Sequence, residues 1–475
     1  MKICFVLEGS YPYVRGGVSS WVDAFMRNLP EHEFVLWTIG DTEKKRGQYE
    51  YELPGNVSLI QENFLDSALK LRINEARNIQ FSPSEREALK QLITCRGPNW
   101  PLLLEIAEKK ANNPVELLMS ETLLDIIKEF AHEAYPSVGF LDLFWTVRSM
   151  FLPVFYLMQQ PVPDATLYHS LSTGYGGLMG ALAGLRHNRP FVLSEHGIYT
   201  REREEEILLS EWVNPAFRPL WIAFFNAISR FCYGSAARVT SLFGDASKIQ
   251  QEMGCPPEKC DVVANGIRVE KYLNIPPKEP DGWIDIGAIV RIAPIKDIKT
   301  LIYTFSNLKH EMPNVRLHIL GPVDDEEYNQ ECLSLIRLYD VKDIIFTGVV
   351  DTAAYLAKLD FTTLSSISEG QPYAVIESLA AGRPVAATNV GSCRELIEGG
   401  AGDTFGPAGI CMPPLHQSEL LHAFVELCQN PERRRKMGEA GRRRAAAFFD
   451  LDKTLSGYLN VYEKATQAWQ ALASN

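Results

Sequence analysis

The amino-acid sequence predicts an α/β protein made of two domains, each built around a parallel sheet. The chain has 475 residues, which is too long for one ordinary domain and suits two. Short apolar runs typical of strands alternate with helical patterns along most of it. The proline-rich stretch 275–280 has the composition of a linker. We therefore expect a first domain at 1–280, a second at 281–450 and a last helical segment at 451–475.

Composition and charge narrow the class of protein. The net charge of −12 argues against nucleic acid or an anionic membrane surface as the main partner. The nine cysteines are scattered and odd in number, without zinc-like spacing, which favours a reduced cytosolic protein. The first residues, MKICFVLEG, have the pattern of a strand and not of a signal peptide. No run of 18 apolar residues occurs. We expect a cytoplasmic protein.

The first domain begins with a strand, a glycine loop and a helix. The strand is expected at Lys2–Leu7 and the helix at 18–29, with Gly16 and Gly17 just before the helix. Two glycines let the backbone approach a ligand closely at a helix N-terminus, but an ordinary strand–helix turn has the same pattern. Further strands of this domain are expected at 34–39, 57–60, 165–169, 190–195, 238–241 and 261–264.

A helical insertion interrupts the first domain at about 66–160. This stretch holds several helical patterns and no convincing strand. Its aromatic residues around 140–156 are expected to pack inside the domain, and a partner or membrane-surface contact is the alternative. The predicted helices are at 84–94, 101–111, 115–134 and 141–158.

Two histidines follow strands of the first domain. His169 ends one strand and His196 directly follows another, at the sheet edge where α/β proteins build their active sites. A single histidine in such a place is also common as a structural residue. Tyr199 and Arg201 come soon after His196, and Arg201 is suited either to a polar acceptor or to pairing with nearby glutamates. These four residues are candidates for the first-domain wall of a site.

The second domain places two cations after its first strand. Arg291 comes directly after the strand expected at 283–290, and Lys296 follows five residues later. Arginine offers a forked contact and lysine a mobile point charge, a combination that suits a diphosphate. Gly348 and Val349 follow a later strand and are placed to touch a nucleobase. The other strands of this domain are expected at 315–320, 344–347, 361–364 and 384–388.

The stretch Ser366–Pro384 carries two glutamates separated by seven residues, Glu369 and Glu377. We expect Glu369 in a loop after a strand, and Glu377 one to two turns into a helix at 373–381. A carboxylate accepts hydrogen bonds from two neighbouring hydroxyls, so Glu377 is suited to a ribose diol and Glu369 to a sugar. A phosphate would lie at the helix N-terminus. Taken alone, the two carboxylates also fit a simpler role as partners of the helix dipole.

The sequence SISEGQPYAVIESLAAGRPVAATNVGSCREL resembles the donor-site signature of the retaining, nucleotide-sugar-dependent glycosyltransferases with the GT-B fold. The resemblance implies two Rossmann-like domains facing a cleft and a C-terminal helix that crosses back to the first domain. It also implies that His196 lies near the transferred sugar and that the paired glycines line the donor phosphates. The chain departs from the family at Gln371-Pro372-Tyr373. The expected donor-binding residues are Gly16, Gly17, Arg291, Lys296, Gly348, Val349, Glu369, Gly370, Gln371, Pro372 and Glu377.

A narrower resemblance is to the PelF-type glycosyltransferases of bacterial Pel exopolysaccharide synthesis. It rests on the segments HGIYTRERE, VRIAPIKDIKT and SISEGQP together with the helical insertion. It implies UDP-glucose as the donor, a saccharide or polysaccharide acceptor, a cytosolic enzyme, and inner-membrane partners from the same polysaccharide machinery. The expected acceptor residues are His169, Tyr199 and Arg201.

The reaction expected is transfer of a glycosyl group from a UDP-sugar to a hydroxyl with retained anomeric configuration. Arg291, Lys296 and the helix N-terminus near Gly370 would stabilise the charge of the leaving diphosphate, so no metal or other cofactor is expected. The expected catalytic residues are Glu369, His196, Arg291 and Lys296. A sugar-nucleotide epimerase or a phosphorylase of the same fold remains an alternative, as does a catalytically silent subunit that binds nucleotide sugars.

Overall fold

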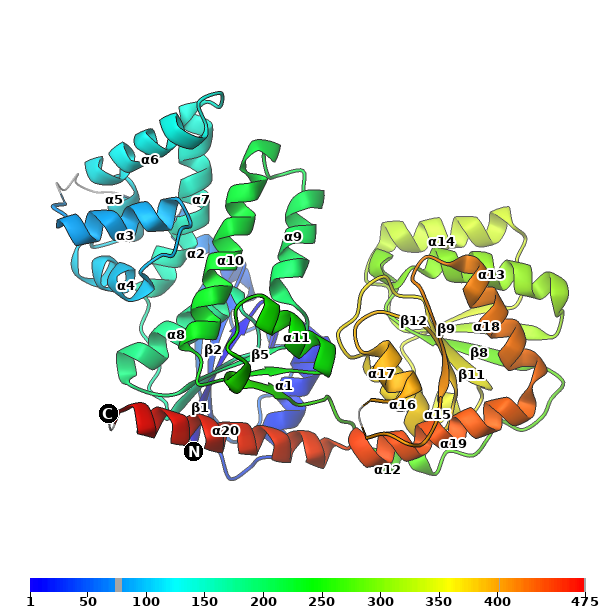
Figure 1. Cartoon of the computed structure of the whole chain (residues 1–475). Coiled ribbons are helices and arrows are strands. Elements are labelled where there is room, and N and C mark those ends of the chain that lie inside the picture. The colour runs from blue at the N-terminus through cyan, green and yellow to red at the C-terminus, as the bar shows by residue number, and fades with distance from the viewer. Residues whose placement is uncertain (73–78, 401, 474–475) are drawn as a thin grey trace. The chain divides into compact units, whose positions relative to one another are not determined.

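The chain forms two compact units, each around one parallel sheet. The computed structural model describes residues 1–72, 79–400 and 402–473 (Figure 1). Unit 1 comprises Met1–Ser241, Ser247–Asp261 and Leu459–Asn475, and unit 2 comprises Leu242–Ala246 and Val262–Tyr458. The chain therefore leaves unit 1 after Asp261, whereas we predicted a boundary at 280.

The sheet of unit 1 has the strand order β3-β2-β1-β4-β5-β6-β7. Its pairings are parallel; Phe5 of β1, for example, lies opposite Leu36 on one side and His169 on the other. Strands β1, β2 and β5 are almost entirely buried, which explains their continuous apolar runs, whereas the edge strands β3 and β7 are more exposed. The strands are β1 (Lys2–Glu8), β2 (Glu33–Gly40), β3 (Val57–Phe64), β4 (Leu167–Ser170), β5 (Phe191–Glu195), β6 (Arg238–Ser241) and β7 (Cys260–Val262).

Helices connect the strands of this sheet. The C-terminal helix α20 (Leu451–Ala473) starts in unit 2 and belongs to unit 1 from Leu459 onward, which confirms the predicted return of the chain. In unit 1 its Tyr462 packs against Phe25 and hydrogen-bonds His169. The other helices that follow strands of this unit are α1 (Gly17–Arg27), α8 (Gly174–His187), α9 (Tyr199–Leu209), α10 (Arg218–Ser235) and α11 (Gly244–Glu252).

The predicted insertion is helical, and it shares one hydrophobic core with the rest of unit 1. The helix expected at 115–134 is instead two helices, because two polar side chains each start a new one. Asn113 accepts from the backbone N–H groups of Val115 and Glu116, and Ser120 accepts from that of Leu123. The helices are α2 (Asp66–Leu69), α3 (Pro83–Ile93), α4 (Trp100–Lys109), α5 (Pro114–Leu118), α6 (Glu121–Ala134) and α7 (Phe140–Met158).

Helix α7 is long and apolar enough to cross a membrane by length and composition, but half of its most apolar window is buried inside unit 1. Phe151 and Phe155 lie in the core, and Phe151 packs against Phe224 of α10. The expected packing role holds for these rings. Trp145 differs, because 56% of it is exposed, with Arg148 over its ring.

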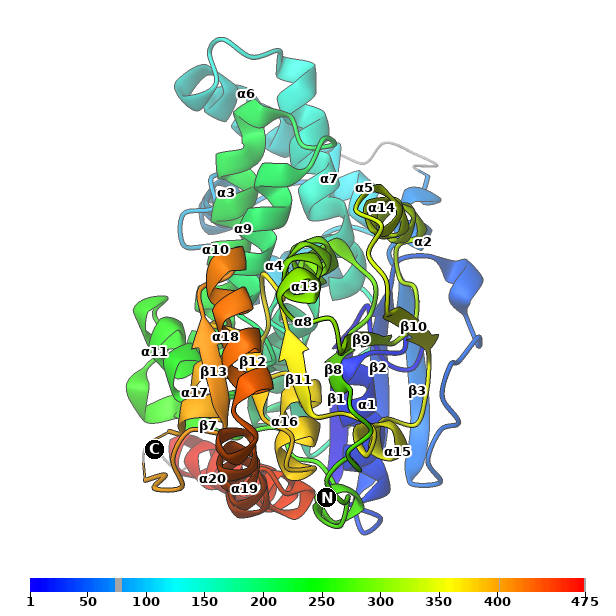
Figure 2. The same ribbon diagram turned by 90° about the vertical axis from the view of Figure 1, so that its right-hand side faces the viewer.

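The sheet of unit 2 has the order β10-β9-β8-β11-β12-β13, again with parallel pairing. Helices α13 and α18 pack together on one face and α16 and α19 on the other (Figure 2). The strands are β8 (Ile284–Ile289), β9 (Val315–Leu320), β10 (Ile344–Gly348), β11 (Phe361–Leu364), β12 (Val385–Thr388) and β13 (Gly409–Met412). The helices are α12 (Glu270–Leu273), α13 (Ile298–Glu311), α14 (Glu326–Leu338), α15 (Thr352–Leu356), α16 (Tyr373–Ala380), α17 (Cys393–Glu398), α18 (Gln417–Gln429) and α19 (Pro431–Phe448).

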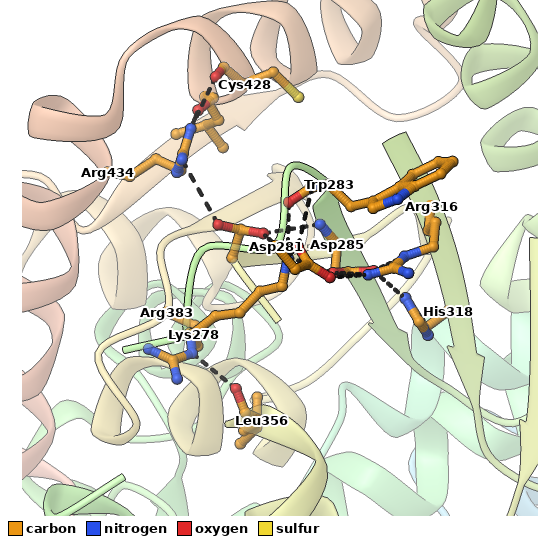
Figure 3. Close-up of polar contacts among 12 residues, drawn as sticks. Lys278, Asp281, Trp283, Asp285, Arg316, His318, Leu356, Arg383, Cys428 and Arg434 are labelled. Carbon is orange, nitrogen blue, oxygen red and sulfur yellow. Dashed lines mark hydrogen bonds and ion pairs between the residues drawn. The ribbon is translucent and has the colours of Figure 1, made fainter. Parts of the chain in front are cut away.

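The stretch predicted as a linker, 275–280, belongs to unit 2 because a buried charge network holds it there (Figure 3). Lys278 Nζ lies 2.6 Å from Asp285, 2.7 Å from Asp281 and 3.3 Å from Asp360. Asp285, at the start of β8, also receives Arg316 Nε at 2.5 Å and a ring nitrogen of the neighbouring His318 at 2.7 Å. The proline content of this stretch is typical of a linker, but its Lys278 is held by ion pairs to the sheet.

Candidate functional site

The strand order of each sheet reverses at one place. In unit 2 it reverses between β8 and β11, because the chain runs from β8 to β9 and β10 on one side and from β11 to β12 and β13 on the other. Open α/β sheets bind ligands outside the carboxyl ends of the strands at such a point. Lys296 follows β8 and Glu369 follows β11, so the two predicted residues come from the loops at this point.

Lys296 and Glu369 form a close ion pair. The Lys296 Nζ atom lies 2.5 Å from Glu369 Oε1, and the side chains are only 15% and 12% exposed. Ser366 Oγ donates to the same carboxylate oxygen at 2.6 Å. A charge this shielded from water is costly unless it is paired, so the lysine stabilises the carboxylate here. The structure thus brings together two residues that are 73 positions apart in the sequence.

A second loop fixes the backbone of Glu369. The N–H of Ser392 donates to the Gly370 carbonyl at 2.9 Å. Gly391 has a φ of +54°, and a Cβ there would lie 2.2 Å from the carbonyl oxygens of both Glu369 and Gly370. Only glycine allows this approach. The segment after β12 therefore supports the loop that carries Glu369.

Glu377 lies on α16, the helix that follows this loop. Its Oε1 accepts a hydrogen bond from the Tyr272 hydroxyl at 2.9 Å. Burial raises the pKa of Glu377, and the Tyr272 bond acts in the opposite direction. No side chain of the described residues caps the N-terminus of α16, where Pro372 is the N-cap residue. The helix start therefore offers backbone N–H groups to an anion.

Gln371 is engaged differently from the prediction. Its Oε1 accepts the backbone N–H of Asn265 at 2.6 Å, and its backbone carbonyl accepts from Asn265 Nδ2 at 3.3 Å. The residue is only 7% exposed. The Gln371 side chain ties the loop after β11 to the segment Asn265-Gly266-Ile267, and its role in donor binding stays a prediction.

The two predicted cations pair with different carboxylates in the structure. Arg291 Nη1 lies 2.5 Å from Asp324 Oδ2, and both side chains are about half exposed, at 49% and 47%. A backbone bridge between Ile292 and Val323 brings Asp324 beside Arg291. Lys296 therefore neutralises Glu369 while Arg291 pairs at the surface. Gly348, the last residue of β10, has a φ of +66°, and Val349, which follows it, is 78% exposed; both lie at the same edge of the sheet.

In unit 1 the strand order reverses between β1 and β4. Gly16 and Gly17 are exposed at the start of α1, in the loop after β1. Glu8, at the end of β1, was not among the predicted residues. Its Oε2 accepts the backbone N–H of Gly176 in α8 at 2.9 Å, and burial raises the pKa of this carboxyl group. Glu8 could have been identified from the sequence, because it is a carboxylate at the end of the first predicted strand.

His169 has a structural role in place of the predicted acceptor contact. It is fully buried, with Nδ1 2.7 Å from the Tyr462 hydroxyl and Nε2 2.7 Å from Ser194 Oγ. Burial lowers its pKa to about 3. The histidine is therefore neutral, and its ring nitrogens join β4, β5 and α20.

His196 differs from His169 in having a ring nitrogen without a partner. Its ring meets Trp21 edge-on at 5.3 Å, and Nε2 is buried without a hydrogen bond among the described residues. Burial lowers its pKa to about 4, so the ring is neutral. Tyr199 starts α9 and is buried under Arg203, whereas Arg201 is exposed. His196 is the predicted residue of unit 1 that retains an unsatisfied polar group.

Within residues 1–72, 79–400 and 402–473, no group of three or more His, Cys, Asp or Glu side chains is arranged to hold a metal ion. The Asp450–Asp452 pair that matches Asp-x-Asp is engaged otherwise: Asp452 lies 3.2 Å from Arg268, and its backbone N–H donates to Asp450. Metal independence stays a prediction.

Comparison with protein families divides the chain at nearly the same place as its structure. The family model described as "Domain of unknown function (DUF3492)" matches residues 1–258. The model described as "Glycosyl transferases group 1" matches residues 284–430, which include β8 to β13. Lys296, Glu369 and Glu377 all lie in this second match.

Among curated proteins, the MMP alpha-(1->4)-mannosyltransferase of Mycolicibacterium hassiacum is 28% identical over 284 residues, or 58% of this chain and 66% of that protein. The chain spans between 38% and 66% of the first relatives that it matches. Among solved structures, Anabaena Alr3699/HepE in complex with UDP has a TM-score of 0.61 at 15% identity, covering 98% of this chain and 100% of that one. Sucrose-phosphate synthase from Thermosynechococcus elongatus also has a TM-score of 0.61 at 15% identity, with 100% of both chains covered. The two parallel-sheet units match the GT-B fold, which confirms the predicted fold class.

Proposed function

Because this chain belongs to the family described as "Domain of unknown function (DUF3492)" and carries a group 1 glycosyltransferase domain in unit 2, we propose that it is a glycosyltransferase. It would move a sugar from a nucleoside diphosphate sugar to a hydroxyl group. The observation that carries the proposal is the Lys296–Glu369 ion pair at the switch point of the unit 2 sheet. Helix α16, which carries Glu377, begins shortly after Glu369 in the chain.

The arrangement suggests a role for each group. In the structure, Lys296 Nζ lies 2.5 Å from Glu369 Oε1. A diphosphate bound at the start of α16 would compete for the lysine charge, and the Glu369 carboxylate would then accept hydrogen bonds from sugar hydroxyls. Glu377 would accept bonds from the ribose diol. As the bond to the sugar breaks, Lys296 and the α16 N–H groups would stabilise the negative charge on the leaving diphosphate.

We further propose UDP-glucose as the donor, with retained configuration at the anomeric carbon. The UDP assignment is supported by the GT-B relative whose structure contains UDP. Glucose, the Pel pathway, a saccharide acceptor, inner-membrane partners and a cytoplasmic location rest on the sequence resemblance. Arg291 would join the donor phosphates after exchanging its surface partner Asp324. We also propose that the reaction needs no metal ion.

Calorimetric titration with UDP tests the proposed site. Lys296→Ala and Glu377→Gln should each weaken UDP binding about tenfold or more, since losing a charge-assisted hydrogen bond costs about 1.5–3 kcal/mol. Lys299→Ala is the matched control, because Lys299 pairs with Glu331 on α14 and should leave UDP binding unchanged. Unaltered UDP affinity in both site variants would contradict the assignment of this site.

Turnover separates a transferase from its alternatives. The wild type should consume UDP-glucose by transfer or slow hydrolysis, and this activity should persist in excess EDTA. Binding of UDP-glucose without any consumption would indicate a silent binding subunit, and interconversion of the sugar would indicate an epimerase. Activity that is lost in EDTA and restored by magnesium would reject metal independence.

A further inference from the structure

Two cysteines lie side by side at the end of unit 1. Cys255 follows α11 and Cys260 is the first residue of β7, with residues 256–259 between them. Their Sγ atoms are 3.5 Å apart, which is van der Waals contact for two sulfur atoms. Both are free thiols in the structure. The proposed function uses neither of them.

The neighbouring backbone holds the two thiols in this position. The Cys255 N–H donates to the Gln250 carbonyl at 2.9 Å. Lys259 Nζ donates to a backbone carbonyl near the end of α10 at 2.6 Å. On the other side, Asp261 pairs with Arg238 of β6 at 2.5 Å. Because these contacts hold Cys255 and the residues on either side of Cys260 in place, little conformational entropy is lost when the two thiols come together.

We propose that Cys255 and Cys260 are a redox-modification site that closes reversibly to a disulfide in the presence of a small oxidising disulfide such as oxidised glutathione. The Cys260 thiolate attacks one sulfur of the small disulfide, whose S–S bond breaks and releases one glutathione thiol. The Cys255 thiolate then attacks the Cys260 sulfur and releases the second. The protein loses two electrons and two protons, and the small disulfide gains both.

The two cysteines differ in access, which sets this order. Cys260 is partly exposed and can meet the oxidant, whereas Cys255 is only 2% exposed. For the bond to form, the sulfur–sulfur distance must shorten to about 2.05 Å. Burial raises the pKa of the Cys255 thiol, so closure should be slow at neutral pH and faster as the pH rises. The bond would tether the edge strand β7 where the chain leaves unit 1.

The experiment uses the reduced full-length protein in mixtures of oxidised and reduced glutathione. Samples are blocked with N-ethylmaleimide, digested with trypsin and analysed by mass spectrometry. Because trypsin cuts after Lys259, the cysteines fall on separate peptides, 249–259 and 260–268, which stay joined only through a disulfide. The joined pair should appear with oxidant, increase with pH and disappear after dithiothreitol.

Two variants make the result specific. Cys260→Ser should abolish the joined peptides, while Cys411→Ser, at a partly buried cysteine of unit 2, should leave their yield unchanged. Folding of each variant is checked by circular dichroism. The proposal is overturned if Cys260 only collects a stable glutathione adduct, or if both thiols remain alkylated under fully oxidising conditions.

Discussion

At the scale of single residues, burial and a neighbouring hydroxyl shift the pKa of Glu377 in opposite directions. Burial raises the pKa of its carboxyl group, while the Tyr272 hydroxyl, 2.9 Å away, stabilises the carboxylate. The proposed contact with a ribose diol needs the carboxylate, because a protonated acid loses part of its capacity to accept hydrogen bonds. Donor affinity should therefore decrease as the pH falls through the raised pKa of Glu377.

Tyr272→Phe tests this dependence. Without the hydroxyl, the pKa of Glu377 rises further, so the loss of UDP affinity on acidification should begin at a higher pH than in the wild type. Calorimetric titration between pH 5.5 and 8 measures the shift. Tyr303→Phe, at a tyrosine that packs against Tyr339, is the control. Coincident pH profiles for Tyr272→Phe and wild type would show that this hydroxyl does not tune Glu377.

At the scale of elements, the loop after β12 positions the loop after β11. Gly391→Ala should displace Glu369, because the added Cβ would lie 2.2 Å from two carbonyl oxygens. We expect UDP affinity to fall about tenfold or more. Gly282→Ala is the matched control: its φ is +83°, and a Cβ there meets no atom within 4 Å. Both variants carry about 1–2 kcal/mol of backbone strain, but only Gly391→Ala should affect UDP binding.

The amino end of β8 depends on Asp285. Burial alone would raise the pKa of this carboxyl, but hydrogen bonds from His318, Arg316 and Lys278 outweigh it and hold the pKa well below its usual value. Asp285→Ala should reduce the free energy of unfolding by about 3–5 kcal/mol at pH 7, because buried cations lose their partner. Urea unfolding measures this loss.

The sign of the pH dependence follows from the lowered pKa. Asp285 stabilises the fold above the pKa of an unfolded aspartate, near 3.9, and this contribution disappears as the pH falls through the folded value. The difference in the free energy of unfolding between wild type and Asp285→Asn should therefore persist from pH 7 to 5 and disappear only at lower pH. Asp281→Asn, at the exposed end of the network, should cost much less. Equal losses in the two Asn variants would contradict a central role for Asp285.

At the scale of the whole molecule, the two units have separate hydrophobic cores. A ligand that binds only the folded state of one unit stabilises that unit, by about 2.7 kcal/mol at a concentration 100 times its Kd. UDP should therefore raise the unfolding transition of unit 2 and leave that of unit 1 in place. Differential scanning calorimetry measures both transitions, and Lys296→Ala, which weakens UDP binding, should reduce the shift. A single transition that moves as a whole would show that the units unfold together.

The amino-acid sequence by itself determined the order and type of most elements and the residues at the unit 2 switch point. Apolar periodicity and glycines at strand ends act within a few residues, so β8, β11 and α16 could be placed from local pattern. Lys296 and Glu369 were each expected in a loop that follows a strand, and the carboxyl ends of parallel strands lie on the same side of a sheet. The break between α5 and α6 is also local, and its signal was the capping residue Ser120.

Only the tertiary structure decided the partner of each polar side chain and the division of the chain into units. Arg291 meets Asp324, Gln371 meets Asn265 and Lys278 meets Asp285, pairs that are 33, 106 and 7 positions apart. His169 was read as a site residue, but its ring hydrogen-bonds the hydroxyl of Tyr462 in α20, which lies 293 positions further on. These partners depend on which segments of the chain pack together. The local sequence does not identify the partner, because a charged side chain can pair with any opposite charge that folding brings close to it.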